Sequence, residues 1–312
     1  MTIQYIRHAQ IDKTKWDARI RGSDLPLPYA MSWYLDASTG MSWDALIGGD
    51  YQYVMPLPVT QKIPFFPQVY QPILTQQLGV FGEAVNRELL QLFLQHLPLV
   101  FGRTALPLHA QNPDLSETLP HVRQRTNLVL DLSLSYPDIR QGYAHGLQQR
   151  LKKAKNNLKI QECDDVDAFV GFCSATLREK LPYNRKDRQQ LRSLLLAIKH
   201  HKAGRMYRVV DPSDHTCAMG LFLVFGGRVI NIMNAVTDPG RKQAALHFLF
   251  DNIIRKFQGQ AAVFDFEGSE IPGVRAFFES FGSKNEPYTF FEKGILPGWL
   301  RVIRSLRRKL PI

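Results

Sequence analysis

Cysteine is scarce in this sequence, with only three residues among 312. Cys163, Cys173 and Cys217 are an odd number, lie far apart and include no C-x-x-C pair. This spacing favours neither a disulfide framework nor a zinc site. A reducing compartment suits such a chain, and we therefore expect a cytoplasmic protein.

Long apolar runs are also missing. The first residues lack the apolar core of a signal peptide. A membrane-spanning helix needs roughly 18 uninterrupted apolar residues, whereas the most apolar stretch, residues 89–101, contains glutamine, histidine and proline. We therefore expect neither a secreted nor a transmembrane protein.

Several motifs that carry well-known chemistry do not occur. The sequence contains no GxxxxGK(S/T) phosphate loop, no GxGxxG dinucleotide loop, no HExxH zinc motif and no GxSxG nucleophile elbow. It therefore gives no support to nucleotide binding through these loops, to a serine hydrolase or to a metal site, and we expect no metal.

Positive charge is what the sequence has in excess. Lysine and arginine number 39 against 28 acidic residues, a formal net charge of +11. One basic cluster covers residues 140–159, which include no acidic residue. Such a cluster suits a phosphate-bearing partner, such as nucleic acid, anionic lipid or a phosphorylated cofactor. A solvated helix face would give the same composition.

A second basic cluster lies in the tail, residues 294–312, which also has no carboxylate side chain. In a helix, its apolar residues fall on one side and its basic residues on the other. This pattern predicts an interfacial helix on an anionic membrane, or a helix docked on its own protein. The basic residues are Arg301, Arg304, Arg307, Arg308 and Lys309.

The chain is long enough for two domains, and 45% hydrophobic with 21% charged residues is an ordinary globular mixture. Both halves show the same order of parts, a hairpin, a helix and a strand, at residues 43–59, 83–97 and 103–108 and again at 217–235, 241–257 and 262–266. We expect one helix over 137–155, and we place His247, Asp251 and Arg255 on the water-facing side of helix 241–257. The pattern predicts an α/β fold with mixed (α+β) sheets, divided into modules 1–133 and 134–293 and the tail 294–312.

The most informative segment is residues 264–274, DFEGSE and its flanks. Strand alternation places Asp265 and Glu267 on one face and Phe264 and Phe266 on the other. Gly268 permits an abrupt turn, and Ser269 can cap the helix that follows. Carboxylates and a serine at the C-terminal end of a strand are typical of a site of chemistry in α/β folds.

The run 265–274, with FFESFG at 277–282 and Tyr288, resembles the C-terminal part of GNAT superfamily acyltransferases. The nearest branch is the FemAB-like and BioF2-like group, which has two tandem GNAT modules per chain and a basic helix similar to residues 150–158. The resemblance is specific over 145–293 and weaker over 1–133. It implies a splayed mixed sheet whose central strands, here 228–235 and 262–266, separate to admit a pantetheine-like arm.

The resemblance also suggests a donor site. GNAT enzymes that use acetyl-CoA usually carry a glycine-rich turn whose backbone N–H groups bind pyrophosphate. The corresponding residues here are Gly240, Arg241, Lys242 and Gln243, with one glycine at the start. The resemblance implies acetyl-CoA or another acyl-CoA as donor, or the aminoacyl-tRNA that FemAB-type proteins use. We expect no other nucleic acid.

Acyl transfer to an amine needs a base for the ammonium proton and an acid for the leaving group. Glu267 is the candidate base, or Asp265 if the strand faces differently, because burial beside phenylalanines raises a carboxyl pKa. Tyr288 is a candidate acid or a wall of the cleft. The structural alternatives are an ion pair or helix cap for Glu267 and a packed aromatic for Tyr288.

Other polar residues are candidates for substrate binding. Arg150 and Lys153, three apart on a helix, can clamp a phosphate or carboxylate or simply be solvated. Asn234, near the end of strand 228–235, can bind the acyl carbonyl or be structural. The remaining candidates are Ser269, Tyr51 and Gln71.

Together these features predict a cytoplasmic N-acyltransferase that moves an acetyl or aminoacyl group from a thioester or aminoacyl donor to an amine. The acceptor would lie in the groove between the modules. A cell-wall or lipid-linked precursor would explain the basic tail and would bring the protein to the inner face of the membrane. The alternative is a catalytically inactive GNAT-fold scaffold that binds an anionic partner.

Overall fold

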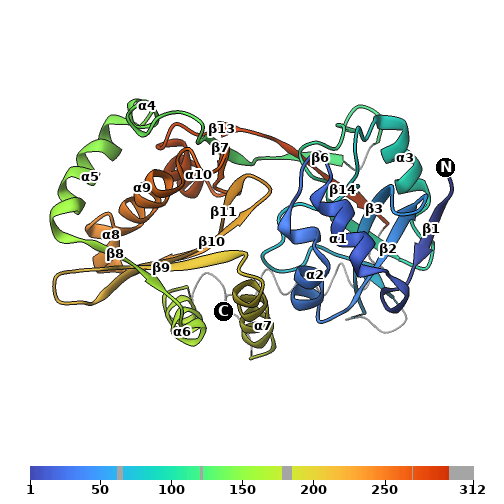
Figure 1. Cartoon of the computed structure of the whole chain (residues 1–312), viewed down its shortest axis with the longest axis horizontal. Coiled ribbons are helices and arrows are strands. Elements are labelled where there is room, and N and C mark those ends of the chain that lie inside the picture. The colour runs from blue at the N-terminus through green and yellow to red at the C-terminus, as the bar shows by residue number, and fades with distance from the viewer. Residues whose placement is uncertain (62–65, 120–121, 178–184, 269, 295–312) are drawn as a thin grey trace, which may run out of the picture.

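The computed structural model describes residues 1–61, 66–119, 122–177, 185–268 and 270–294, which fold into two mixed sheets covered by helices (Figure 1). The first seven-stranded sheet has the order β1-β2-β3-β4-β5-β14-β6, and the second has the order β13-β7-β12-β11-β10-β9-β8. The mixed α/β class expected from the sequence is confirmed.

The elements have the following bounds. The first sheet contains β1 (Ile3–Ile6), β2 (Trp43–Gly48), β3 (Tyr53–Thr60), β4 (Gln68–Val69), β5 (Arg103–Pro107), β6 (Val122–Arg125) and β14 (Tyr288–Lys293). The second contains β7 (Leu128–Asp131), β8 (Lys159–Cys163), β9 (Gly204–Val210), β10 (Thr216–Phe225), β11 (Arg228–Val236), β12 (Val263–Asp265) and β13 (Lys284–Asn285). The α-helices are α1 (Lys13–Arg21), α2 (Ser32–Thr39), α3 (Arg87–Gln95), α4 (Tyr136–Gln141), α5 (His145–Asn157), α6 (Val166–Thr176), α7 (Arg185–His200), α8 (Asp238–Lys242), α9 (Ala245–Phe257) and α10 (Pro272–Glu279).

Each half contains the predicted hairpin, helix and strand. In the first half β2 and β3 pair antiparallel around a turn where Gly49 has a φ of 61°, which favours glycine. In the second, β10 and β11 pair antiparallel around Gly226 and Gly227, with φ of 56° and 75°. Helices α3 and α9 then lead to β5 and β12, and β12 pairs parallel with β11.

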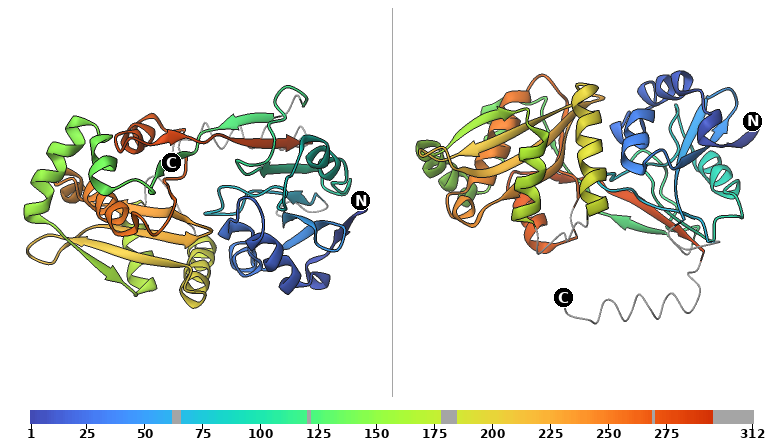
Figure 2. Two further views of the ribbon diagram at one scale, coloured as in Figure 1. Left: turned by 45° about the horizontal axis from the view of Figure 1, so that its top comes forward. Right: turned by 90° about the horizontal axis from the view of Figure 1, so that it is seen from below.

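The two sheets exchange strands where they meet. β6 lies at the edge of the first sheet, and the chain runs on into β7 of the second; β13 lies at the edge of the second, and the chain returns into β14, between β5 and β6. The two crossings lie side by side, since Glu286 N–H donates to Asn127 O at 2.8 Å. They form the bridge between the two lobes in Figures 1 and 2.

The module boundary expected at residue 133 does not coincide with the division between the two sheets. β7 precedes that position yet belongs to the second sheet, and β14 comes near the end of the described chain yet belongs to the first. Local sequence patterns show that a segment is a strand, but not which sheet it joins. Of the expected tail, residues 295–312 lie outside the described residues.

Two helices differ from expectation. The predicted helix 137–155 is divided at Gly142 into α4 and α5, and the predicted helix 241–257 is divided into α8 and α9 at Ala244, which has a φ of 59°. His247 and Asp251 are only part-exposed. The centres of the His247 and Phe277 rings lie 4.5 Å apart, and Asp251 accepts a hydrogen bond from the Tyr136 hydroxyl. The water-facing placement was wrong for both, because α4 and α10 cover this side of α9.

The central strands of the second sheet separate, as the resemblance implies. β11 pairs with β12 only over Arg228–Ile230, opposite Val263–Asp265, and then continues for six residues to Val236. Beyond the paired part, the Asn231 Nδ2 donates to Phe266 O at 3.2 Å and bridges the opening. The chain that leaves β12 then meets the first lobe, where the Tyr29 hydroxyl donates to Glu267.

Candidate functional site

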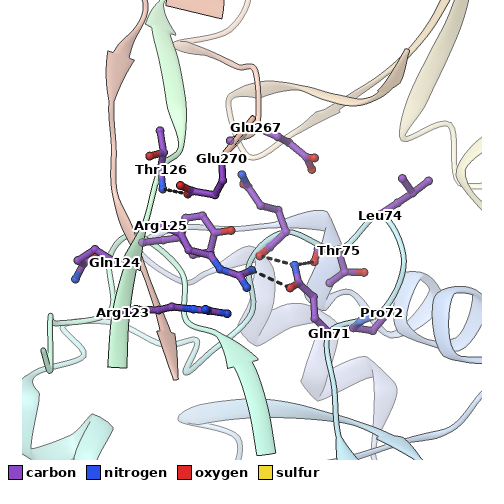
Figure 3. Close-up of a pocket in the computed structure, with 13 residues that line it drawn as sticks. Gln71, Pro72, Leu74, Thr75, Arg123, Gln124, Arg125, Thr126, Glu267 and Glu270 are labelled. Carbon is purple, nitrogen blue, oxygen red and sulfur yellow. Dashed lines mark hydrogen bonds between the residues drawn. The ribbon is translucent and has the colours of Figure 1, made fainter. Parts of the chain in front are cut away.

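A polar cavity of about 520 Å³ lies where the two lobes meet (Figure 3). Four segments line it: the loop around residues 71–76, the end of β6 with the residue after it (123–126), the residues Glu267, Gly268 and Glu270 after β12, and Tyr288 at the start of β14. Both strand crossings therefore contribute to its walls, so the cavity depends on the exchange of strands.

Glu267 lines this cavity and stands two residues after the end of β12. Its backbone has a φ of 58°, and its N–H donates to Asp265 Oδ1 at 2.9 Å. Its carboxylate accepts a hydrogen bond from the Tyr29 hydroxyl. Burial of the carboxyl among protein atoms raises the pKa of Glu267 to about 8, although part of the residue is accessible from the cavity. Such a group exchanges a proton near physiological pH.

Tyr29 is the partner that the sequence did not reveal. It lies in a single turn of 3₁₀ helix before α2, is 1% exposed, and is separated from Glu267 by 238 residues of chain. Burial, together with the Glu267 charge, holds the pKa of Tyr29 well above its usual range, so its hydroxyl stays protonated. Tyr34, beside it, donates to Leu74 O in the cavity wall.

Asp265 is held in a buried ionic cluster. Its Oδ2 accepts from Arg228 Nη1 at 2.9 Å, and Arg228 Nη2 donates to Glu286 at 2.7 Å. Asn127, at the other crossing, donates to Asp265 at 3.4 Å. Asp265 is 1% exposed and does not line the cavity. This environment ties Asp265 to the strand exchange and to positioning the Glu267 backbone.

Tyr288 and Gln71 do line the cavity together with Glu267. Tyr288 is 5% exposed, and burial raises the pKa of its hydroxyl, which favours the protonated, donating form. Gln71 Nε2 donates to Thr75 O at 2.8 Å, and its Oε1 accepts from Arg125 at 3.1 Å. Arg123, Arg125 and Glu270 complete the charged lining and were not among the predicted residues.

The residues expected to hold a donor phosphate lie at α8 and do not line the cavity. Gly240 is packed against β10, since a Cβ there would lie 2.3 Å from Cys217 O. Packing therefore explains this glycine without a ligand. Arg241 and Lys242 are exposed, and α9 starts at Ala245 without a side-chain cap. These features fit a phosphate through a helix N-terminus and basic side chains, but they do not form a glycine-rich cradle.

The remaining candidates are spread over the molecule. Gln243 ends α8, and Asn234 donates to Asn231 Oδ1 at 3.1 Å beside the opening between β11 and β12. Arg150 lies on α5 with Nη1 3.4 Å from His247 Nε2, and Lys153 is exposed on the same helix.

Tyr51 lies in the turn between β2 and β3, where its hydroxyl accepts from Asp12 N–H at 2.7 Å. None of these five residues lines the cavity. Ser269 lies outside the described residues.

The described residues contain neither a metal-binding cluster nor a membrane-spanning helix. No group of three or more histidine, cysteine, aspartate or glutamate side chains in this part of the chain is arranged to hold a metal ion. Among the described helices, none combines the length and the apolar character that a membrane crossing requires.

Two mixed sheets that exchange strands, each with a hairpin, a helix and a parallel pair of strands, define a tandem GNAT-like fold. FemX has this fold, with a TM-score of 0.69 over 97% of this chain and 99% of FemX, at 11% identity. The C-terminal domain of a putative lysylphosphatidylglycerol synthetase from Agrobacterium fabrum matches with a TM-score of 0.59, at 11% identity, over 96% of this chain and 95% of that one.

A tandem GNAT protein from the clavulanic acid biosynthesis pathway matches with a TM-score of 0.57, at 12% identity, over 95% of this chain and 100% of that one. No family model matches the chain, and no curated protein matches its sequence. At these identities the structural likeness establishes the fold, and the expected FemAB-like tandem GNAT architecture is confirmed.

Proposed function

We propose that this protein is an acyltransferase that moves an acyl or aminoacyl group from a thioester or aminoacyl ester to an amine. The proposal rests on the placement of Glu267. This part-buried carboxyl has a pKa of about 8, lies where β11 and β12 separate, and faces the cavity between the lobes. A base with this proton affinity suits an ammonium group that must lose its proton near neutral pH.

In the proposed reaction the Glu267 carboxylate takes one proton from the acceptor ammonium. The freed nitrogen lone pair attacks the donor carbonyl carbon, a C–N bond forms, and the carbonyl π electrons move to oxygen. When the C=O bond re-forms, the bond from carbon to the donor sulfur or oxygen breaks, and the leaving group receives a proton. The nitrogen loses its second proton to solvent.

Tyr29 and Tyr288 have distinct proposed roles. The Tyr29 hydroxyl donates to the Glu267 carboxylate and favours its ionised form. Tyr288 keeps its proton and lines the same cavity, so it is the candidate acid for the leaving group. Asp265 acts through its bond to the Glu267 N–H as a positioning residue.

We also propose the chemical identity of the donor and of the acceptor. The donor is acetyl-CoA, another acyl-CoA or aminoacyl-tRNA, with Gly240, Arg241, Lys242, Gln243 and Asn234 as the proposed contacts. FemX and the putative lysylphosphatidylglycerol synthetase among the structural neighbours favour an aminoacyl donor and a cell-wall or lipid precursor as acceptor. Arg150 and Lys153 on the basic helix α5 are proposed contacts to a phosphorylated substrate.

The test compares Glu267→Gln with wild type in transfer from a panel of acyl-CoAs and aminoacyl-tRNAs to small amines and amine-bearing precursors. Glu279→Gln, which removes an exposed carboxylate from α10, is the matched control. Loss of a positioned general base should lower kcat/KM by about 100-fold or more, while the control stays near wild type. Undiminished transfer by Glu267→Gln would refute the base assignment.

The scaffold alternative gives a different result. If no donor in the panel supports transfer by wild type and none raises its melting temperature, the transferase proposal fails and a non-catalytic binding protein is favoured. A ligand at 100 times its Kd stabilises the folded state by about 2.7 kcal/mol, which a melting experiment detects easily.

A further inference from the structure

Two arginines on the cavity wall have no acidic partner within the described chain. Arg123 and Arg125 stand two positions apart on β6 and therefore on the same face of the strand. Their guanidinium carbons lie 4.8 and 3.7 Å from the centre of the Phe290 ring on the neighbouring strand β14. Figure 3 shows both side chains directed toward the cavity from this wall.

Neutral groups hold the better-buried arginine in place. Arg125 Nη1 donates to Gln71 Oε1 at 3.1 Å, and Gln71 is itself fixed by its bond to Thr75 O. Stacking on Phe290 adds an attraction between the cation and the ring face. These contacts orient the guanidinium group without neutralising its charge.

The carboxyl groups of the cavity are engaged elsewhere. Glu270 Oε1 accepts from the Thr126 N–H at 3.2 Å, and Glu267 accepts from Tyr29. Because burial raises the pKa of Glu267 to about 8, this residue is mostly uncharged at pH 7. The cavity therefore has an excess of positive charge on the β6 wall.

From this geometry we propose that Arg123 and Arg125 form an anion-binding subsite for the acceptor. The subsite holds a carboxylate or phosphate group of the acceptor while the acceptor's amine reaches Glu267. Guanidinium groups pair with the oxygens of carboxylates and phosphates through parallel hydrogen bonds. A volume of about 520 Å³ accommodates a ligand that spans both ends. The placement of the amine rests on the proposed function, whereas the anion binding does not.

Calorimetric titration of the full chain with inorganic phosphate, and separately with glutarate, tests the subsite and distinguishes the two anion types. The variant is Arg123→Gln/Arg125→Gln. The control is Arg188→Gln/Arg255→Gln, which removes the same charge from exposed positions on α7 and α9. At least one anion should bind wild type and the control alike, and the cavity variant should bind it at least about tenfold more weakly.

Binding that is equal in wild type and the cavity variant would overturn the subsite, as would a lack of binding of both anions to wild type. Circular dichroism and melting temperature establish that the cavity variant is folded, and single substitutions replace it if it is not. Glu267→Gln should keep its anion affinity. Loss of anion binding in the arginine variant, together with no transfer by wild type from any donor in the panel, would refute the proposed function but leave the subsite intact.

Discussion

Glu267 has a different proton affinity in the folded and the unfolded chain. Burial raises its folded pKa to about 8, against 4.5 for an unperturbed glutamate. Between these values the folded state binds more protons than the unfolded state, so the contribution of this group to stability is complete below pH 4.5 and is lost as the pH rises through 8. The slope reaches about 1.4 kcal/mol per pH unit.

We therefore expect Glu267→Gln to become more stable relative to wild type as the pH rises from 5.5 to 7.5. Urea unfolding at several pH values gives the free energies of unfolding, and their difference should change by about 1.4 kcal/mol per pH unit. The exposed Glu279→Gln variant should follow wild type in parallel. A parallel curve for Glu267→Gln as well would contradict the raised pKa.

Removal of the Tyr29 hydroxyl should shift the pH dependence of catalysis. Because this hydroxyl stabilises the Glu267 carboxylate, Tyr29→Phe should raise the pKa of Glu267 further and move the rising limb of kcat/KM to higher pH. At pH 7 the rate should fall by about three- to tenfold, whereas at high pH it should approach wild type. An equal loss at every pH would indicate a structural role for Tyr29 instead.

The sequence predicted part of the site. Glu267, Tyr288 and Gln71 were expected and do line the cavity. Tyr29 and Arg125 were not foreseen. Tyr29 meets Glu267 only through a contact between the lobes, and Arg125 reaches the cavity where the chain crosses between the sheets. Helical and strand periodicity describes which residues share one face of one element, and it contains no information about pairs that lie hundreds of residues apart.

At the level of elements, the turn after β12 depends on close contact with the first crossing. A Cβ on Gly268 would lie 1.6 Å from Thr126 O, so any larger residue must push the turn away from the end of β6. Gly268→Ala should destabilise the protein by about 1–3 kcal/mol and distort the cavity that this turn lines. Chemical denaturation and anion titration measure the two effects.

Gly273 offers a matched comparison. It lies near the start of α10, and a Cβ there would meet no atom within 4 Å. Alanine in a helix is favoured over glycine, so Gly273→Ala should be neutral or stabilising by up to about 1 kcal/mol. If both alanine variants had the same stability, the contact between Gly268 and Thr126 would not be the constraint that the structure indicates.

Elements with a strong local pattern were predicted well, and short ones were not. The hairpin β2–β3 and the amphipathic helices α3 and α9 lie near their expected positions, because alternation or helical spacing is sustained over many residues. β4 and β13 have two residues each, too few for any pattern. They form because neighbouring strands offer them hydrogen-bond partners, a tertiary effect that local sequence does not encode.

For the whole molecule, the charge of the tail remains a prediction about partners. The full chain should co-sediment with vesicles that contain anionic lipid, and substitution of Arg301, Arg304 and Arg307 by glutamate should abolish that binding. Neutral vesicles serve as the control, and binding should weaken as salt is added. Equal sedimentation of the charge-reversed protein would exclude the tail as the membrane contact.

The strand exchange makes a stronger prediction about cooperativity. β14 completes the first sheet although it follows the second half in sequence, and Arg228, Asp265 and Glu286 join the crossings in a buried ionic cluster. Neither sheet can keep all its strands while the other unfolds. The two lobes should therefore unfold in a single transition, unlike two independent domains joined by a linker.

Probes in each lobe can test this. Trp16 and Trp43 are buried in the first lobe, and Cys217 is buried in the second. In a background where the other tryptophans are phenylalanine and the other cysteines serine, tryptophan fluorescence and Cys217 labelling should give the same urea midpoint. Glu286→Gln should lower both midpoints together, because it weakens the cluster that both lobes share. Two separate midpoints would show that the lobes are stable independently, and that the cavity between them can be lost while each half stays folded.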